Sequence, residues 1–218
     1  MGGHKRIIAL MLLTSGLTIL TVVILPLLYS QWNYFKKGGY FFDPSEVTIN
    51  TRTLAAETIS VDYTNANNWF APSVPLKPVE SKVGYYTLSV PSVKLKDVPV
   101  EINGVNLKKN AIQYPGTALP GTFGNPVIFG HSTLPYLYKV NDPISIFNPL
   151  LKVKKGDEVI VDYDGITFRY RVAETWEVSP DKVEVLAQRY DKHELTLITC
   201  IPLGTYLHRF VVRAELVN

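Results

Sequence analysis

The stretch that decides the fold is EVIVDYDGITFRYRVAE, residues 158–174. Two runs in it, 158–163 and 166–174, carry β-branched and aromatic residues in near alternation, which is the pattern of a half-buried strand. Only Asp164 and Gly165 separate the runs, and an Asp-Gly pair suits a two-residue turn in which both residues adopt positive φ. The stretch therefore predicts a β-hairpin.

Five further strand-like runs lie before and after this hairpin, separated by turn residues such as Asn103-Gly104. They are Tyr85–Val90, Val98–Ile102, Pro126–Phe129, Leu195–Cys200 and Arg209–Val217. Short strands at this spacing are typical of an all-β sandwich or barrel. Two segments between strands, 142–151 and 179–186, are each expected to form a short helix or 3-10 turn.

The composition agrees with one β domain plus an appendage. The chain has 218 residues, of which 46% are hydrophobic and 19% charged, so a core can form. Fifteen prolines, fourteen glycines and thirteen tyrosines favour a turn-rich β protein over a helical bundle. The single cysteine excludes an intrachain disulfide and a multi-cysteine zinc site.

Residues 7–28 form an uncharged apolar segment. As a helix, these 22 residues would extend roughly 33 Å, against about 30 Å of bilayer hydrocarbon. Lys5 and Arg6 lie in the leader 1–6, so the positive-inside rule keeps the leader in the cytoplasm and exports the rest of the chain. A cleaved signal peptide has a shorter apolar run that ends in small residues, which Tyr29 to Trp32 do not supply. We expect a single-pass anchor whose partner is membrane lipid.

Residues 29–82 lack sustained periodicity and end in the proline-rich run Pro72–Pro78. Prolines at this spacing favour extended polyproline geometry, and we expect a stalk that lifts the domain 83–218 off the membrane. Outside the leader and anchor the charges nearly cancel, with 20 basic and 19 acidic residues. A nearly neutral domain has no positive electrostatic field that would attract nucleic acid.

Cys200 is the first candidate for chemistry. Alternation along its strand puts Ile198 on the same face, with Leu197 and Thr199 on the other. Pro202 ends the strand just beyond, so the thiol lies at a strand end beside a loop. A lone cysteine is often only a small buried hydrophobe, whereas a nucleophile needs a base and an oxyanion donor nearby.

His131 is the candidate base. It follows the apolar run 126–130, so its imidazole is displayed from a strand end, and a pKa near neutrality suits proton transfer. Two other histidines compete for this role. His193 lies in a polar run expected to be a solvated turn, and His208, next to Arg209, is the stronger rival.

Arg209 is the candidate oxyanion donor, although a solvated charged strand face is the alternative interpretation. The loop 201–208 joins the last two strands into an antiparallel pair, which brings Cys200 and Arg209 together near the loop. Arg213 lies roughly 13 Å further along the strand. A guanidinium keeps its charge and offers several donors to a developing oxyanion.

These residues carry a resemblance to a known family. Residues 196–200 read TLITC, which matches the TLxTC signature of sortases, the membrane-anchored cysteine transpeptidases of bacterial cell surfaces. The resemblance is strengthened by His131 some seventy residues upstream, by Arg209, by the N-terminal anchor and by the segment QYPGTALPG at 113–121. It covers roughly residues 85–217.

The resemblance implies an eight-stranded closed barrel with Cys200, His131 and Arg209 around a groove, and no metal or organic cofactor. The substrates would be exported proteins with an LPxTG-like C-terminal sorting signal. Cys200 would attack the carbonyl before the signal's last residue, and His131 would protonate the leaving amine. The thioester would pass to an acceptor amine, such as a cell-wall peptide or a protein lysine, while Arg209 and backbone amides hold the oxyanion. Candidates for lining the groove are Thr199, Ile198 and Ser132.

Three alternatives limit this interpretation. A pilus-polymerising role is not expected, because Asp43-Pro44 precedes Ser45 rather than an aromatic residue. A papain-like thiol hydrolase places its Cys before its His at a helix N-terminus, whereas here the His comes first and Pro202 opposes a helix. A noncatalytic anchored β domain for adhesion or envelope assembly is the alternative from a different class.

Ordinary pKa values set an expectation for the rate. With values near 8.5 and 6.5, the thiolate and the imidazolium would each be roughly a tenth populated at about pH 7.5, and both together about 1% of the time. The sequence therefore predicts slow turnover.

Overall fold

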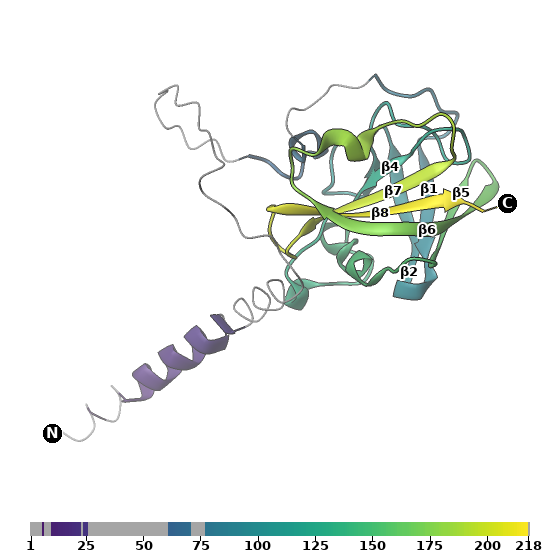
Figure 1. Cartoon of the computed structure of the whole chain (residues 1–218). Coiled ribbons are helices and arrows are strands. Elements are labelled where there is room, and N and C mark those ends of the chain that lie inside the picture. The colour runs from purple at the N-terminus through teal and green to yellow at the C-terminus, as the bar shows by residue number, and fades with distance from the viewer. Residues whose placement is uncertain (1–5, 7–9, 23, 26–60, 71–76, 218) are drawn as a thin grey trace, which may run out of the picture. The chain divides into compact units, whose positions relative to one another are not determined.

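The computed structural model describes residues 6, 10–22, 24–25, 61–70 and 77–217. The chain divides into two compact units, Met1–Glu57 and Thr58–Asn218. The second unit contains a closed β-barrel of eight strands (Figure 1). The strands are β1 (Tyr85–Val90), β2 (Leu95–Ile102), β3 (Ala111–Gln113), β4 (Val127–Phe129), β5 (Glu158–Tyr163), β6 (Ile166–Val178), β7 (Glu194–Ile201) and β8 (His208–Leu216). The all-β barrel expectation is confirmed.

The strand order around the barrel is β1-β2-β3-β4-β7-β8-β6-β5. Neighbouring strands pair antiparallel, except that β2 pairs parallel with β3 and β4 parallel with β7. Because β4 and β7 run in the same direction, their carboxyl ends meet at the same end of the barrel. This pairing later brings two candidate site residues together.

The predicted hairpin is formed by β5 and β6, which pair antiparallel as far as Tyr163↔Ile166. Asp164 has φ 49° and Gly165 has φ 77°, so both turn residues adopt the positive φ that the two-residue turn requires. β6 is longer than predicted and continues to Val178, where it pairs with β8.

All seven strands predicted from the pattern are present, with small shifts at their ends. The pattern did not indicate β3. Its three residues are all buried, so they show no alternation, and a three-residue run gives little periodicity to detect.

Short 3-10 helices occupy the loops. The predicted segment 142–151 contains η5 (Pro143–Ser145) and η6 (Asn148–Lys152), and the segment 179–186 contains η7 (Val183–Leu186). The remaining described 3-10 helices are η2 (Ala66–Asn68), η3 (Pro91–Val93) and η4 (Pro135–Leu137).

Two apolar clusters lie on the two sides of the barrel wall. Along β7, Leu195 and Leu197 belong to the inner cluster, which fills the barrel. Ile198 and Cys200 belong to the outer cluster, on the opposite face of the same strand. Every residue of β7 is buried, so both faces of this strand are covered.

Residues 61–70, which we call the strap, cover part of the outer face. Ala66, Trp69 and Phe70 are buried in the outer cluster. The sequence analysis placed these residues in the stalk 29–82; in the structure two of their large aromatic side chains, Trp69 and Phe70, bury against the barrel. Val79 also contacts the barrel region through two hydrogen bonds with the Asn103 side chain, at 2.9 and 2.8 Å. The rest of the predicted stalk, 29–60 and 71–76, lies outside the described residues.

In the first unit, the described residues 10–22 and 24–25 are helical. They belong to the predicted membrane segment 7–28. The other residues of that segment, and all of the leader 1–6 except Arg6, lie outside the described residues. Among the residues that are described, no helix combines the length and the hydropathy of a membrane span.

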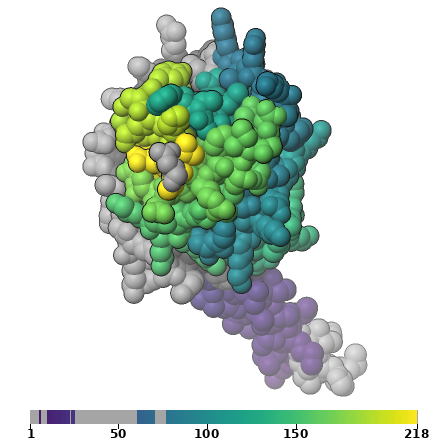
Figure 2. Space-filling view, turned by 90° about the vertical axis from the view of Figure 1, so that its right-hand side faces the viewer, coloured from purple at the N-terminus to yellow at the C-terminus, as the bar shows by residue number. Residues whose placement is uncertain are grey.

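The two ends of the barrel carry different parts of the chain. The end of β7 meets the start of β8 at one end of the barrel, since these strands pair antiparallel. Figure 2 views the opposite end, where the last residues of β8, in yellow, reach the surface. There the Val217 N–H donates to the Arg169 carbonyl at 2.8 Å.

Candidate active site

Cys200 lies near the end of β7, directly opposite Arg209 on β8. Side chains at opposed positions of an antiparallel pair project to the same face of the sheet. The thiol and the guanidinium therefore share the outer face of the barrel wall. This register agrees with the pairing expected from the loop 201–208.

His131 reaches the same place from β4. In the parallel pair of β4 with β7, Phe129 is opposite Ile198, and the Gly130 N–H donates to the Ile198 carbonyl at 3.1 Å. Continuing this register by two residues brings His131 level with Cys200. The imidazole Nε2 is buried and has no hydrogen-bond partner, so it is free to exchange a proton with a group that enters the site.

Two hydroxyl groups fasten the end of β4 to β7 at this point. The Ser132 hydroxyl donates to the Cys200 carbonyl at 2.6 Å, and the Thr199 hydroxyl donates to the Gly130 carbonyl at 2.8 Å. Together they fix the backbone on both sides of the imidazole relative to the backbone that carries the thiol.

The Arg209 guanidinium is fully buried and forms no ion pair among the described residues. Its Nε and Nη2 both donate to the Trp69 carbonyl, at 3.0 and 2.5 Å. Its Nη1 donates to the carbonyls of Tyr206 and His208, at 2.9 and 3.1 Å. The rings of Trp69 and Phe70 lie 5.4 and 5.8 Å from the guanidinium carbon. Neutral partners leave the positive charge uncompensated, which suits a group that stabilises an oxyanion.

The strap seals these three residues from solvent. Cys200 and Arg209 have exposed fractions of 0%, and His131 has 4%. The Trp69 ring packs 5.1 Å from the Phe129 ring and 6.0 Å from the imidazole of His131. The site is therefore assembled but covered.

Burial dominates the ionisation of the covered site. It raises the pKa of the Cys200 thiol to about 12, although the positive charge of Arg209 acts in the opposite direction. It lowers the pKa of His131 to about 4, against the attraction of the Asp62 carboxylate. Desolvation disfavours the charged form of each group, so both are neutral while the strap is in place.

Two cavities border the strap. One, of about 310 Å³, is lined by His131 and Ser132 together with Thr64 of the strap. The other, of about 340 Å³, is lined by Arg209 together with strap residues that include Phe70. The strap thus lies between a cavity on the imidazole side and a cavity on the guanidinium side.

The three residues predicted to line the groove occupy different positions. Ile198 is on the outer face, in the same cluster as Cys200, and Ser132 borders the cavity beside His131. Thr199 differs from the prediction, because alternation turns it away from that face and its hydroxyl bonds the Gly130 carbonyl. Thr199 fastens the site from behind rather than lining it.

The rival histidines lie elsewhere. His193 precedes the start of β7, at the other end of the strand from Cys200, and its ring lies tilted against the ring of Phe123, 4.0 Å between centroids. His208 neighbours Arg209 on β8, so alternation points its side chain away from the face that carries the guanidinium. Of the three histidines that the structure describes, only His131 is brought beside the thiol on its own face.

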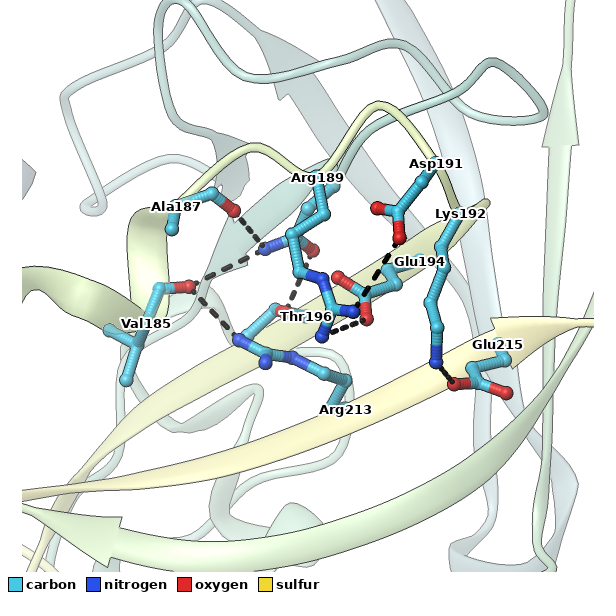
Figure 3. A network of polar contacts seen from close by, with 10 residues as sticks. Val185, Ala187, Arg189, Asp191, Lys192, Glu194, Thr196, Arg213 and Glu215 are labelled. Carbon is cyan, nitrogen blue, oxygen red and sulfur yellow. Dashed lines mark hydrogen bonds and ion pairs between the residues drawn. The ribbon is translucent and has the colours of Figure 1, made fainter.

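A polar network fixes the loop between β6 and β7 over the rest of the outer face (Figure 3). Asn125 lies at its centre: its Nδ2 donates to the carbonyls of Val185 and Ala187, both at 3.4 Å, and its Oδ1 accepts from the Thr196 hydroxyl at 2.8 Å. Further out, Arg189 pairs with Asp191 and Glu194, and Lys192 pairs with Glu215. The network holds Val185 in the outer cluster, to which Cys200 also belongs.

No metal centre is assigned. The described parts of the chain contain no group of three or more His, Cys, Asp or Glu side chains that could hold an ion.

Sequence analysis missed Trp69 as part of the site and Asn125 as the centre of the polar network over the outer face. Trp69 lies in a segment without periodicity, but Asn65 before it is a good helix-capping residue and Trp69-Phe70 is a pair of large aromatic side chains, which is unusual in a solvated stalk. The position of Asn125 depends on contacts with residues sixty or more positions away, which no local pattern encodes.

A closed barrel with a thiol, an imidazole and a guanidinium at one end defines the class of protein as a thiol enzyme on a β scaffold. The sortase domain family matches residues 88–217. Sortase A of Bacillus anthracis is 29% identical over 164 residues, covering 74% of this chain and 73% of that protein. Two solved structures are similar. Sortase C-1 of Actinomyces oris has a TM-score of 0.55 and 28% identity over 63% of this chain and 76% of that one. Sortase A of Listeria monocytogenes has a TM-score of 0.52 and 29% identity over 63% and 89%. The chain belongs to the sortase family of cysteine transpeptidases.

Proposed function

We propose that this enzyme cleaves an LPxTG-like C-terminal sorting signal of exported proteins and transfers the new acyl group to an amine at the cell surface. The observation that supports it best is the convergence of Cys200, His131 and Arg209, from three separate strand ends, on one face of the barrel. A thiol, a proton carrier and a fixed cation are the groups that acyl transfer through a thioester needs.

In the first half of the reaction, the Cys200 thiol passes its proton to His131, and the resulting thiolate attacks the carbonyl carbon before the last residue of the signal. The carbonyl oxygen becomes an oxyanion, which Arg209 and backbone amides stabilise. The carbon–nitrogen bond then breaks, His131 gives its proton to the leaving amine, and a thioester remains on Cys200. The guanidinium and the thiol are on the same side of one strand pair, so both reach the same carbonyl.

In the second half, an acceptor amine attacks the thioester carbon and passes a proton to His131. The carbon–sulfur bond breaks and the thiolate of Cys200 returns, so the enzyme leaves the cycle with the protons it had at the start. The cavity of about 310 Å³ beside His131 and Ser132 is the place we assign to this amine.

We propose further that residues 7–28 anchor the enzyme in the membrane, with the leader in the cytoplasm and the barrel outside. The described residues 10–22 support this in two ways. Their large apolar side chains are exposed; Leu13, for example, is 71% exposed. The hydroxyls of Thr14, Thr18 and Thr21 donate to carbonyls of their own helix, so no hydroxyl hydrogen of these threonines is left to face lipid. Removal of the segment should release the protein from the membrane fraction.

The test is a peptide assay with the full-length protein. A labelled LPxTG peptide and a glycine-based amine should yield an amide product and, when the amine is left out, a mass increase on Cys200. Cys200→Ala should form neither species. A Cys200→Ala protein that still joins peptide to amine would refute the proposal, as would a parent enzyme that forms no adduct with any sorting-signal peptide.

A further inference from the structure

The loop that follows β4 exposes a run of large apolar side chains. Of the nine residues 136–144, five are large and apolar and are more than a third exposed. They are Tyr136, Leu137, Tyr138, Val140 and Ile144, which we call the apolar rim. In the rest of the described barrel unit, exposed side chains of this kind occur singly or as one pair, on separate segments. Single exposed apolar residues are ordinary, whereas a group of them on one loop marks a surface that binds a partner.

Hydrogen bonds hold the segment 133–145, which we call the rim loop, in a shape that keeps these side chains outside. The buried Ser145 hydroxyl donates to the Lys139 carbonyl at 2.9 Å and accepts from the Lys139 N–H at 3.1 Å. At the start of the loop, the buried Asn148 side chain accepts from the Thr133 N–H at 2.8 Å and donates to the Thr133 carbonyl at 2.9 Å. Because the loop is tied at its start and across its second half, the apolar rim is displayed by a built structure.

The apolar rim borders the entrance to the candidate site. Leu134 and Ile144 of the rim loop line the cavity of about 310 Å³ that His131 also lines. The loop between β7 and β8 packs against the rim loop, since a Cβ added to Gly204 would lie 2.6 Å from the Leu134 side chain. That loop adds another exposed apolar side chain, Leu207, which is 60% exposed. The apolar surface and the cavity that we assign to the acceptor amine therefore share one end of the barrel.

The charges around the apolar rim are mostly positive. Lys139 lies within the rim loop, and Lys108, which lines the same cavity, is followed by Lys109; all three are exposed. Asp142 is the only acidic residue of the rim loop, and Asp62 of the strap lies close enough to Lys108 to interact with it. Tyrosine, leucine and valine beside lysine suit the surface of a bilayer, where the rings lie among the headgroups and the lysines pair with anionic lipid.

We propose that the apolar rim docks on an anionic lipid bilayer and holds the entrance of the site at the membrane surface. This inference rests on the proposed function, including the membrane anchor 7–28. With that anchor, the 32 residues from 29 to 60 keep the barrel within about 110 Å of the bilayer at full stretch. Lipid is therefore a partner that the rim meets within its own tethered molecule, so weak contacts suffice. Docking presents the cavity beside His131 to substrates held on the same membrane.

An environment-sensitive dye on the rim tests docking, with the full-length protein in vesicles of phosphatidylcholine and phosphatidylglycerol. In a Cys200→Ala background, Leu137→Cys carries the dye on the rim and Ile166→Cys carries it as the control. The two parent side chains are similarly exposed, 52% and 57%, and Ile166 lies at the other end of the barrel because β6 begins where β8 ends. The dye at residue 137 should shift to the blue and lose emission by at least about twofold on lipids with brominated acyl chains. The dye at residue 166 should do neither.

Three results of the dye experiment would overturn docking. A dye at residue 137 that neither shifts nor is quenched shows that the rim stays in water. A dye that shifts without being quenched, and shifts back when the protein is diluted in the vesicles, shows that a second copy of the chain covers the rim. Protein that does not float with the vesicles contradicts the anchor and the rim together.

Polar substitutions on the rim link docking to the reaction. Leu137→Ser combined with Val140→Ser removes apolar area from the rim, and Ile166→Ser combined with Tyr190→Ser removes exposed apolar area elsewhere. Each protein, with Cys200 intact and in vesicles, receives a soluble LPxTG peptide or one held in the same bilayer by an acyl chain. The ratio of the rate with the bilayer-held peptide to that with the soluble peptide should fall by at least about fivefold in the rim pair, because docking raises the local concentration of substrate at the site. The control pair should keep the ratio of the parent.

The two readouts separate the rim from the proposed function. Lipid quenching at residue 137 together with a lower ratio in the rim pair supports the whole inference. If quenching is seen and the rim pair keeps the ratio of the parent, the rim docks but its role in presenting the site is overturned, while the proposed function survives. If no protein transfers either peptide, the proposed function fails, and the dye alone decides whether the rim docks on lipid.

Discussion

At the residue scale, the covered site keeps its two reacting groups neutral. Burial raises the pKa of Cys200 to about 12 and lowers that of His131 to about 4. A thiolate paired with an imidazolium is therefore rarer here than the roughly 1% that ordinary pKa values allow. Water entering with the substrate would move both pKa values back toward their ordinary range. Exposing the site to water therefore also makes the reactive pair of thiolate and imidazolium more abundant.

Arg209→Lys should produce two opposite effects. Lysine keeps the positive charge but lacks the paired guanidinium nitrogens, Nε and Nη2, that both donate to the Trp69 carbonyl. The strap is held less firmly, so alkylation of Cys200 should become faster than in the parent. Transpeptidation should fall by about 10²-fold, since one oxyanion donor is worth this much. Arg213→Lys, on the same strand face, is the control and should leave the rate of peptide transfer close to that of the parent. Unchanged transfer in Arg209→Lys would dismiss its role in the reaction.

His131 makes stability depend on pH in a defined direction. Its pKa in the folded protein is about 4, below the ordinary 6.5, so between these values the unfolded chain binds a proton that the folded one does not. The stabilisation from keeping this imidazole neutral is fully present above pH 6.5 and is lost as the pH falls toward 4. Urea unfolding at about pH 7 and about pH 4.5 should therefore show a larger loss of unfolding free energy in the parent than in His131→Asn. His193→Asn should behave as the parent does, and equal losses in all three proteins would contradict the burial of His131.

At the element scale, the parallel pair of β4 and β7 sets the distance between imidazole and thiol. The Thr199 hydroxyl bonds the Gly130 carbonyl beside the site, and the Thr196 hydroxyl bonds the Asn125 side chain further back on the same strand. Thr199→Val and Thr196→Val are near-isosteric and should each cost about 1–3 kcal/mol of unfolding free energy, because each leaves a buried acceptor unpaired. Only Thr199→Val should lower kcat for peptide transfer, with KM little changed. A similar loss of kcat in both variants would mean that the effect comes from stability alone.

Gly130 lies where the backbone after β4 packs closely against the Phe147 ring. A Cβ added there would lie 2.5 Å from the Phe147 ring, which is buried and cannot move aside. Gly130→Ala should therefore lower the unfolding free energy by about 1–3 kcal/mol and displace the neighbouring His131. Gly84→Ala, whose Cβ would meet nothing within 4 Å, is the matched control and should leave both stability and peptide transfer unchanged. A Gly130→Ala enzyme with parent stability would show that the β4 end has more room than its packing indicates.

The elements that the sequence predicted well are those whose signal is local. The Asp164-Gly165 turn and the alternation around it define the β5–β6 hairpin, and the TLITC run with the loop after it defines the pairing of Cys200 with Arg209. The sequence did not predict β3, because its three residues are all buried and show no alternation of apolar and polar side chains. Thr199 was predicted to line the groove, although the alternation of its own strand turns it away from the face of Cys200.

At the scale of the whole molecule, the assignment of residues 61–70 shows where sequence reasoning stops. A stalk and a strap have the same local features, namely no periodicity and many polar residues. What distinguishes them is whether Trp69 and Phe70 find a surface on which to bury, and that surface includes residues of β3, β4, β7 and β8, which begin about forty or more residues later. The barrel can therefore be predicted from the patterns of its strands. The packing of the strap over the site cannot, because it depends on contacts between distant parts of the chain.

The difference between the barrel and the strap predicts which part of the full-length protein opens most easily. Barrel strands lose their pairing only together, whereas the strap is tied to the body by few hydrogen bonds and closes no ring of strands. Native-state hydrogen exchange should therefore show the amides of Ala66 and Trp69 opening with a lower free energy, and a weaker dependence on denaturant, than those of Leu197 and Ile198 in β7. The Tyr170 side chain, whose hydroxyl accepts a hydrogen bond from the Gly121 N–H at 2.7 Å, ties another loop to the barrel, so the Gly121 amide is an internal reference. If the strap amides exchange only with global unfolding, the strap is part of the cooperative core, and substrate would have to reach Cys200 by another route.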